Sequence, residues 1–206
     1  MNAYALTTVT RLKAFIGIDV TTYDAVFAVI IDAVTDFIEN ECDRRFKETA
    51  YVSQQFSGES SNEVVFPQWP ISSSESFEIA YRNAGSFGNE SFTAINSNEY
   101  RIEYETGIVG LSYKLNTGFL NFKASYTAGY AFDNVTEGSL VPLSEVGLSD
   151  LELAVWKLCS RAYANRKGAG NISRMKLYNY DVTFSKEAYS DDEIKEVLTK
   201  YKRFTF

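Results

Sequence analysis

The sequence predicts an α+β fold, a helical bundle that carries an inserted antiparallel β-sheet or small barrel. Apolar residues recur at helical spacing near both ends of the chain, and they alternate with polar residues over residues 49–130. Aromatic residues, which favour strands, make up 15% of the 206 residues. We therefore expect residues 1–48 and 148–206 to form a helical core, with an N-terminal helix pair and two C-terminal helices, and residues 49–135 to form a β subdomain.

Residues 6–46 are expected to form the helix pair. Thr7 or Thr8 can cap a short first helix, and Gly17 suits the left-handed position that ends it. Thr21 or Thr22 can cap a longer second helix. The stripe expected to be buried on this second helix, in which only the final acid is polar, consists of Val26, Val29, Ile30, Ala33, Val34, Phe37, Ile38 and Glu41.

Between the helices, apolar residues occur at every second position, and this alternation predicts β-strands. The alternation is clearest at residues 100–105, 109–115 and 120–126. Thr106-Gly107 is expected to turn between the first two of these strands. Residues 116–118, with Gly118 in a left-handed position, are expected to join the last two as a hairpin.

The two C-terminal helices are predicted by their start signals. Ser149 and Glu152 have the spacing of a capping box, in which the hydroxyl and the carboxylate each bind a free backbone amide, and Ser190 and Glu193 repeat that spacing. The first of these helices has an apolar stripe of Leu151, Val155, Leu158, Cys159 and Ala162. The last helix has a stripe of Ile194, Val197, Leu198 and Tyr201.

The chain lacks the residues that most enzymes use. It has no histidine, which excludes Ser–His–Asp and Cys–His sites, His-ligated zinc and histidine acid–base catalysis. No glycine-rich phosphate loop follows a predicted strand. We therefore expect no enzyme, no catalytic residue, no cofactor and no metal site. Cys42 and Cys159 are expected to be small buried residues in a reducing cytoplasm, with a disulfide between helices as the alternative.

The net charge of −7 argues against tight nonspecific binding to nucleic acid. One segment differs, because no acid occurs between Leu153 and Tyr180, where the basic residues are Lys157, Arg161, Arg166, Lys167, Arg174 and Lys176. This segment is expected either to face DNA or an acidic partner, or to be neutralised by acids elsewhere in the fold or in a neighbouring subunit. No apolar run approaches the roughly 20 residues that span a bilayer, and no secretory signal is apparent. We expect no membrane contact and a protein that stays in the compartment where it is made.

Several stretches resemble one protein family in their amino-acid sequence and in their order along the chain. They are LTTVTRLKAFIGI at residues 6–18, FIENECDRRF at 37–46, VFPQWPISSSESFEIAY at 65–81, YTAGYA at 126–131, DLELAVWKLCSRAYANR at 150–166 and DDEIKEVLTKYKR at 191–203. With them the chain resembles the small head–tail connector proteins of tailed bacteriophages, also called adaptor or head-completion proteins. No single stretch is a chemical signature, and the specificity of the resemblance lies in the order of the stretches over most of the chain.

The resemblance implies a structural virion protein. Connectors of this family form a ring, usually of twelve subunits, under the portal, where the ring extends the DNA channel and joins the head to the stopper or tail. The implied partners are copies of the chain itself, the portal protein, a stopper or tail-completion protein, and genomic DNA that passes without sequence specificity. The implied place is the head–tail neck of the virion, after synthesis in the host bacterial cytoplasm. The large β subdomain departs from the family's minimal, mostly helical members. The alternative is a β-sandwich binding module, carbohydrate- or adhesin-like, with helical extensions.

The resemblance also implies where partners bind. In that family the last helix engages the portal, so the expected portal-binding residues are Ile194, Val197, Leu198, Tyr201, Phe204 and Phe206. The alternative is that the last two aromatic residues fold back on the chain's own core. Arg166, Lys167 and Arg174 are the candidates for phosphate contacts in the DNA lumen.

Overall fold

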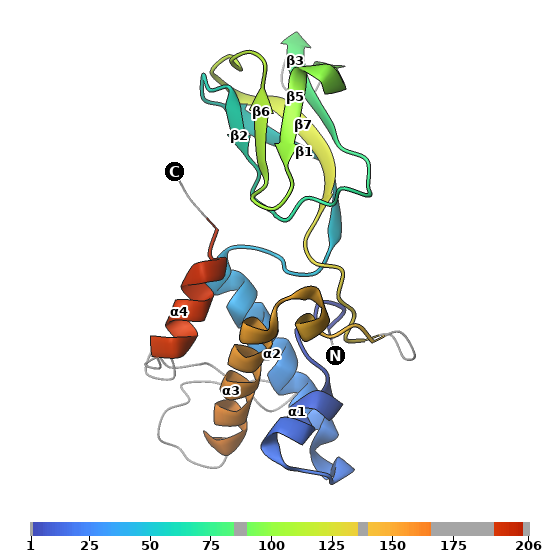
Figure 1. The fold of residues 1–206 in the computed structure, drawn as a ribbon, viewed down its shortest axis with the longest axis vertical. Helices are drawn as coiled ribbons and strands as arrows, with labels where there is room; N and C mark the ends of the chain where they lie inside the picture. Colours follow the sequence, from blue (N-terminus) through green and yellow to red (C-terminus); the bar gives the residue numbers. More distant parts are fainter. Residues whose placement is uncertain (1, 85–89, 136–139, 166–191, 204–206) are drawn as a thin grey trace. The chain divides into compact units, whose positions relative to one another are not determined.

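The structure is a computed structural model that describes residues 2–84, 90–135, 140–165 and 192–203 (Figure 1). It divides into two compact units. The helical unit comprises Met1–Phe46 and Ala131–Phe206, and the β unit comprises Lys47–Tyr130. The β unit is thus inserted into the sequence of the helical unit.

Four α-helices and two short 3-10 helices form the described part of the helical unit. In chain order they are α1 (Val9–Ile16), η1 (Thr21–Tyr23), α2 (Asp24–Cys42), η3 (Leu143–Val146), α3 (Ser149–Asn165) and α4 (Asp192–Tyr201). The long helix α2 contacts each of the other three α-helices, as Figure 1 shows. It therefore carries the core of this unit.

The ends of α1 follow local sequence signals. The Thr8 hydroxyl accepts a hydrogen bond from the Arg11 amide at 3.1 Å, and Gly17 has a φ of 78°, so both predicted ends are confirmed. The predicted threonine cap of α2 is wrong. Thr21 and Thr22 belong to the 3-10 turn η1, which runs directly into α2, and Tyr23 at the N-cap position makes no side-chain capping bond.

The buried face of α2 differs from the predicted stripe. Its buried residues are Phe27, Ile30, Ile31, Val34, Thr35, Ile38, Glu39 and Cys42. The buried acid is therefore Glu39 and not Glu41, which is exposed. The Glu39 carboxylate accepts hydrogen bonds from the Phe46 amide at 3.2 Å and from Arg45 Nη1 at 2.9 Å. Those partners engage both carboxylate oxygens and fix the chain where it leaves α2, although burial still raises the pKa of Glu39.

A second apolar face runs along α2. The remaining apolar members of the predicted stripe are half-buried: Val26, Val29, Ala33 and Phe37. They lie on the side of the helix away from Phe27 and Ile31. Because α2 is apolar on two faces, its pattern alone does not decide which face enters the core.

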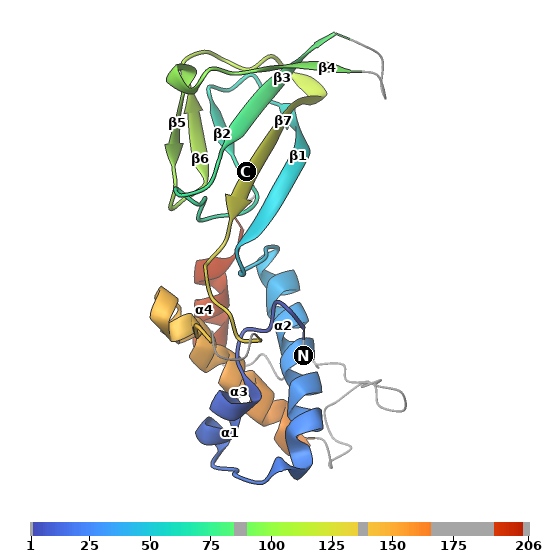
Figure 2. The same ribbon diagram turned by 90° about the vertical axis from the view of Figure 1, so that its right-hand side faces the viewer.

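The β unit consists of two antiparallel sheets. Its strands are β1 (Thr49–Gly58), β2 (Glu63–Val65), β3 (Glu78–Ala84), β4 (Ser91–Ala94), β5 (Tyr100–Glu103), β6 (Ile108–Leu111) and β7 (Gly118–Ala128). The first sheet has the order β1-β7-β3-β4 and the second the order β2-β6-β5. Figure 2 shows the two sheets facing each other. The described strands form no closed barrel, and the predicted α+β class is confirmed.

One hydrophobic cluster lies between the two sheets. Val64 and Val109 enter it from one sheet, and Ile79 and Phe122 enter it from the other. Phe66 is at its centre, with ring centroids 5.3 Å from Phe56, 5.5 Å from Phe77 and 4.8 Å from Tyr126, all in edge-on arrangements. Such aromatic pairs add to the energy of area burial, so Phe66 joins the two layers.

The strand connections are partly as predicted. Strands β5 and β6 pair around the predicted turn at Thr106-Gly107, which is confirmed. The predicted hairpin at residues 116–118 is wrong, because β6 pairs with β2 and β5 whereas β7 pairs with β1 and β3. Residues 112–117 instead cross from one sheet to the other. Backbone bonds from Ser112 to Glu99 and from Leu115 to Ser61 hold this crossing segment in place.

The chain enters and leaves the β unit at one point. Lys47 and Tyr130 form a β-bridge, and the Glu48 amide donates to the Tyr130 carbonyl at 2.9 Å. Gly129 lies against this bridge with a φ of 115°, and a Cβ at Gly129 would be 2.7 Å from the Lys47 carbonyl oxygen. Only glycine allows the two chain segments to approach so closely.

Candidate functional site

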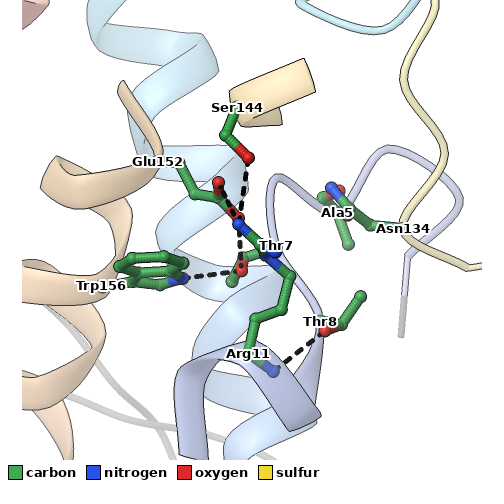
Figure 3. Close-up of polar contacts among 8 residues, drawn as sticks. All are labelled: Ala5, Thr7, Thr8, Arg11, Asn134, Ser144, Glu152 and Trp156. Atoms are coloured by element: carbon green, nitrogen blue, oxygen red, sulfur yellow. Dashed lines mark hydrogen bonds and ion pairs between the residues drawn. The ribbon is translucent and has the colours of Figure 1, made fainter. Parts of the chain in front are cut away.

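An ion pair between the partly exposed Arg11 and the buried Glu152 connects α1 and α3 (Figure 3). Glu152 is 1% exposed and accepts from Arg11 at both carboxylate oxygens, with Arg11 Nε 2.7 Å from Oε1 and Nη2 2.8 Å from Oε2. Arg11 Nη2 also donates to Ser144 Oγ in η3 at 3.1 Å. The planar guanidinium matches the planar carboxylate, and this two-bond arrangement fixes their orientation.

A tryptophan and a threonine complete this cluster. Trp156 Nε1 donates to Thr7 Oγ1 at 2.8 Å, and the Arg11 guanidinium lies 5.4 Å from the centroid of the Trp156 ring (Figure 3). The Phe15 ring lies 5.3 Å from the same ring. The capping role predicted for the Glu152 carboxylate is wrong, because Arg11 and Thr7 use that carboxylate.

The hydrogen bonds of this cluster stabilise the charge of Arg11. The hydrogen bonds to Glu152 raise the pKa of Arg11 even though burial opposes the charge. Both carboxylate oxygens of Glu152 are engaged by Arg11, so this acid is not placed to exchange a proton with a substrate. The cluster therefore serves to hold α1, η3 and α3 in a fixed arrangement.

The predicted portal-binding stripe of α4 lies in the core of the helical unit. Ile194, Leu198 and Tyr201 are buried, and Val197 is half-buried. Cys42 Sγ lies 3.6 Å from the Leu198 carbonyl, to which it donates. Phe204 and Phe206 lie outside the described residues. In this conformation, three of the six residues predicted to bind the portal pack against their own unit.

Polar bonds also fasten α4 to α3. Asp150 accepts from the Tyr201 hydroxyl at 2.6 Å and from Lys200 Nζ at 2.7 Å. Burial alone would raise the pKa of the Asp150 carboxyl, but the hydrogen bonds from Lys200, Tyr201 and the Leu151 amide lower it below its ordinary value. Burial and the bond to Asp150 raise the pKa of Tyr201 to about 12. Asp150 is thus held as the anion that both donors need.

We expect Asp150→Asn to make α4 less stable at neutral pH and to have a smaller effect as the pH falls below about 4. The pKa of Asp150 is lower in the folded chain, so its contribution is present above its unfolded pKa of about 3.9 and is lost as pH falls through the folded pKa. The pKa of Tyr201 is raised in the folded chain, so the stability that its hydroxyl contributes is lost as pH rises toward about 12.

Urea unfolding of the two proteins at pH 7 and pH 3 measures this difference. Asp192→Asn is the control, because the Asp192 side chain is fully exposed and 3.8 Å from its ion-pair partner Lys195. A difference between Asp150→Asn and the parent chain that is as large at pH 3 as at pH 7 contradicts the assignment.

The described part of the basic segment is engaged within the fold. Lys157 forms an ion pair with Glu193 of α4, which agrees with neutralisation by acids elsewhere in the fold. Arg161 is half-buried and makes contacts of its own. The DNA-lumen candidates Arg166, Lys167 and Arg174 lie outside the described residues, so their role stays a prediction.

The remaining site predictions concern metals, membranes and thiols. Within the described ranges, no three side chains of the metal-binding types come together as a metal ion would need. In the same ranges no helix has the length and apolar character to cross a bilayer. Cys42 and Cys159 are free and buried, and burial raises the pKa of the Cys42 thiol to about 12. Both cysteines are therefore packing residues.

Neither a scan against protein-family models nor a search of curated proteins finds a match for this chain. Nine chains of solved structures match in fold, and three of them follow. A chain in the neck of an empty gene transfer agent (GTA) particle, computed with C6 symmetry, has a TM-score of 0.55 and 12% identity, covering 100% of this chain and 95% of that chain. A chain in the virion of a native GTA particle has a TM-score of 0.54 and 14% identity, covering 98% and 91%. A chain in the neck of a native GTA particle, computed with C12 symmetry, has a TM-score of 0.54 and 16% identity, covering 100% and 94%. At these identities the likeness concerns the fold.

Proposed function

We propose that this chain is a structural neck protein of a phage-like particle, which joins the head to the stopper or tail. The observation that carries this proposal is the likeness in fold to chains from GTA necks over nearly the full length of both chains. That likeness includes the β unit as well as the helical unit, since it covers 100% of this chain. The ordered resemblance of six stretches to phage connector proteins supports the same function independently.

The proposed assembly is a ring of identical subunits, with twelve as the expected number. In a cyclic ring of more than two copies, each subunit binds its neighbours through two different surfaces. The helical unit offers two sets of apolar side chains suited to such contacts. Val26 and Val29 form one set, on the half-buried face of α2, and the other set is a pair of exposed side chains on two helices, Phe15 of α1 and Leu153 of α3. Burial of these side chains between copies would stabilise the ring.

The ring would act by geometry and without catalysis, extending the DNA channel below the portal. The net charge of −7 suits a channel through which DNA slides without sticking. Arg166, Lys167 and Arg174 are proposed to supply a few phosphate contacts in the lumen. Because Ile194, Leu198 and Tyr201 are buried in their own unit, we propose that they position α4 and that Val197, Phe204 and Phe206 make the direct contacts with the portal.

An image of the neck of the intact particle tests these proposals together. We expect a ring of this chain between portal and tail, with its C-terminal residues against the portal and residues 166–174 toward the DNA. Native mass spectrometry of the purified chain at high concentration, with and without portal, measures the number of subunits in the assembly. A neck without this chain contradicts the proposed function. A ring with residues 166–174 on its outer wall contradicts only the lumen assignment.

A further inference from the structure

The β unit has an open groove with a volume of about 490 Å³. Its walls come from β3, β4, the 3-10 turn η2 (Ser97–Glu99) and the crossing segment 112–117. The lining residues are Tyr81, Arg82, Thr93, Ala94, Asn96, Glu99, Tyr113, Lys114, Leu115, Asn116 and Asn121. The groove thus combines two tyrosines with several amide and charged side chains, and it takes no part in the proposed ring contacts.

The two tyrosines form an accessible aromatic surface. Tyr81 on β3 is 40% exposed and Tyr113 on the crossing segment is 38% exposed. Burial raises the pKa of Tyr113, and so does the nearness of Glu99 and Tyr81, which shows that these three groups are neighbours. Within the part of the chain that the structure describes, no hydrogen bond uses the hydroxyl of either Tyr81 or Tyr113. Each ring therefore presents an apolar face together with an available donor and acceptor.

Hydrogen bonds hold the walls of the groove in a fixed shape. Asn121 accepts from the Gly58 amide at 2.6 Å and donates to the Asn116 carbonyl at 2.6 Å. Asn96 and Glu99 form a capping box, in which the Asn96 amide donates to Glu99 Oε2 at 3.3 Å. A preformed site loses little conformational entropy when a ligand binds.

This chemistry suits a sugar chain. A pyranose ring has one face of C–H groups, which packs on an aromatic ring, and a rim of hydroxyls, which pairs with planar polar groups. The groove offers Tyr81 and Tyr113 for the face. For the rim it offers the Glu99 carboxylate, the Asn116 amide and the Lys114 ammonium. We propose that this groove binds an oligosaccharide.

Other ligands fit less well. Nucleic acid would meet the Glu99 carboxylate on a chain whose net charge is −7. A protein segment would find apolar contact chiefly on Tyr81 and Tyr113, because Leu115, the largest aliphatic residue of the lining, is itself buried in the β unit. Glu99 is also the one carboxylate among the described residues of the lining, and hydrolysis of a glycosidic bond ordinarily uses two. The groove is therefore expected to bind sugar without cleaving it.

An array of immobilised neutral and acidic oligosaccharides, probed with the purified chain, tests the proposal. We expect binding to a restricted set of glycans, and about tenfold weaker binding by Tyr81→Ala and by Tyr113→Ala. Tyr104→Ala is the matched control, because Tyr104 is 41% exposed in the same unit and does not line the groove. Circular dichroism confirms that each variant is folded, and the bound glycan should be recovered intact.

Three outcomes would overturn the proposal: no binding to any glycan on the array, equal loss of binding with Tyr104→Ala, or groove variants that bind glycans normally but no longer assemble into necks. The last outcome would make the groove a protein contact. The array uses the isolated chain, so its result does not depend on ring formation. A chain that assembles in necks but binds no glycan would sink this inference and leave the proposed function standing.

Discussion

Phe66→Ala is expected to lower the free energy of unfolding of the β unit by about 3–5 kcal/mol. Phe66 is buried between the two sheets and makes edge-on contacts with three other rings, including Phe56 and Tyr126. Truncation to alanine removes these contacts and leaves a cavity that two hydrogen-bonded sheets cannot readily close. Phe119→Ala is the control, because Phe119 is 65% exposed and its truncation should cost much less.

The measurement is urea unfolding followed by tryptophan fluorescence. The chain has two tryptophans, of which Trp69 belongs to the β unit and Trp156 to the helical unit. A Trp156→Phe background therefore leaves Trp69 as the reporter of the β unit. A destabilisation by Phe66→Ala no larger than that by Phe119→Ala would show that Phe66 is not the centre of the β core.

Arg11→Ala is expected to destabilise the helical unit by about 3 kcal/mol, toward the lower end of the range for breaking a buried ion pair. The substitution leaves the Glu152 carboxylate buried without the partner that donates to both of its oxygens. The effect stays toward the lower end because the Arg11 side chain is partly exposed, so water can reach the vacated position.

Two further substitutions separate charge from geometry. Arg11→Lys keeps the positive charge but cannot make the paired bonds, and we expect an intermediate loss of stability. Lys202→Ala removes a partner from the exposed pair with Glu41 and should cost about 0–1 kcal/mol. Helical circular dichroism during urea unfolding is the measurement, since Arg11 lies over Trp156 and its loss changes that fluorescence directly. Equal effects of Arg11→Ala and Lys202→Ala would contradict the buried-pair interpretation.

Sequence reasoning succeeded where a feature depends on neighbouring residues. The cap at Thr8 and the left-handed end at Gly17 are set within one helical turn, and both are present as predicted. The turn at Gly107 is equally local. The α+β class follows from periodicity alone, which does not depend on how the elements pack.

Predictions failed where distant residues decide the outcome. The pattern of α2 offers two apolar faces, and the one that became buried was chosen by contacts with α1, α3 and α4. Glu152 has a capping spacing, but Arg11, distant in sequence, takes its carboxylate. The apolar stripe of α4 was predicted correctly, but the prediction did not show that Ile194, Leu198 and Tyr201 are buried in their own unit. The groove was not predicted, because Tyr81 and Tyr113 come from separate segments that only the folded β unit brings together.

The bridge between Lys47 and Tyr130 has a consequence for the order of folding. Before the β unit folds, α2 and α3 are joined by a loop that contains this whole unit. Each doubling of loop length costs about 0.6 kcal/mol of closure entropy, and this loop is roughly two doublings longer than residues 43–46 and 131–148, the part of it that lies outside the β unit. Once the β unit has folded, its two ends lie side by side, and the closure penalty for the helical unit falls by about 1 kcal/mol. The insertion thus brings the two halves of its host together, and the helices are expected to assemble fastest after it has folded.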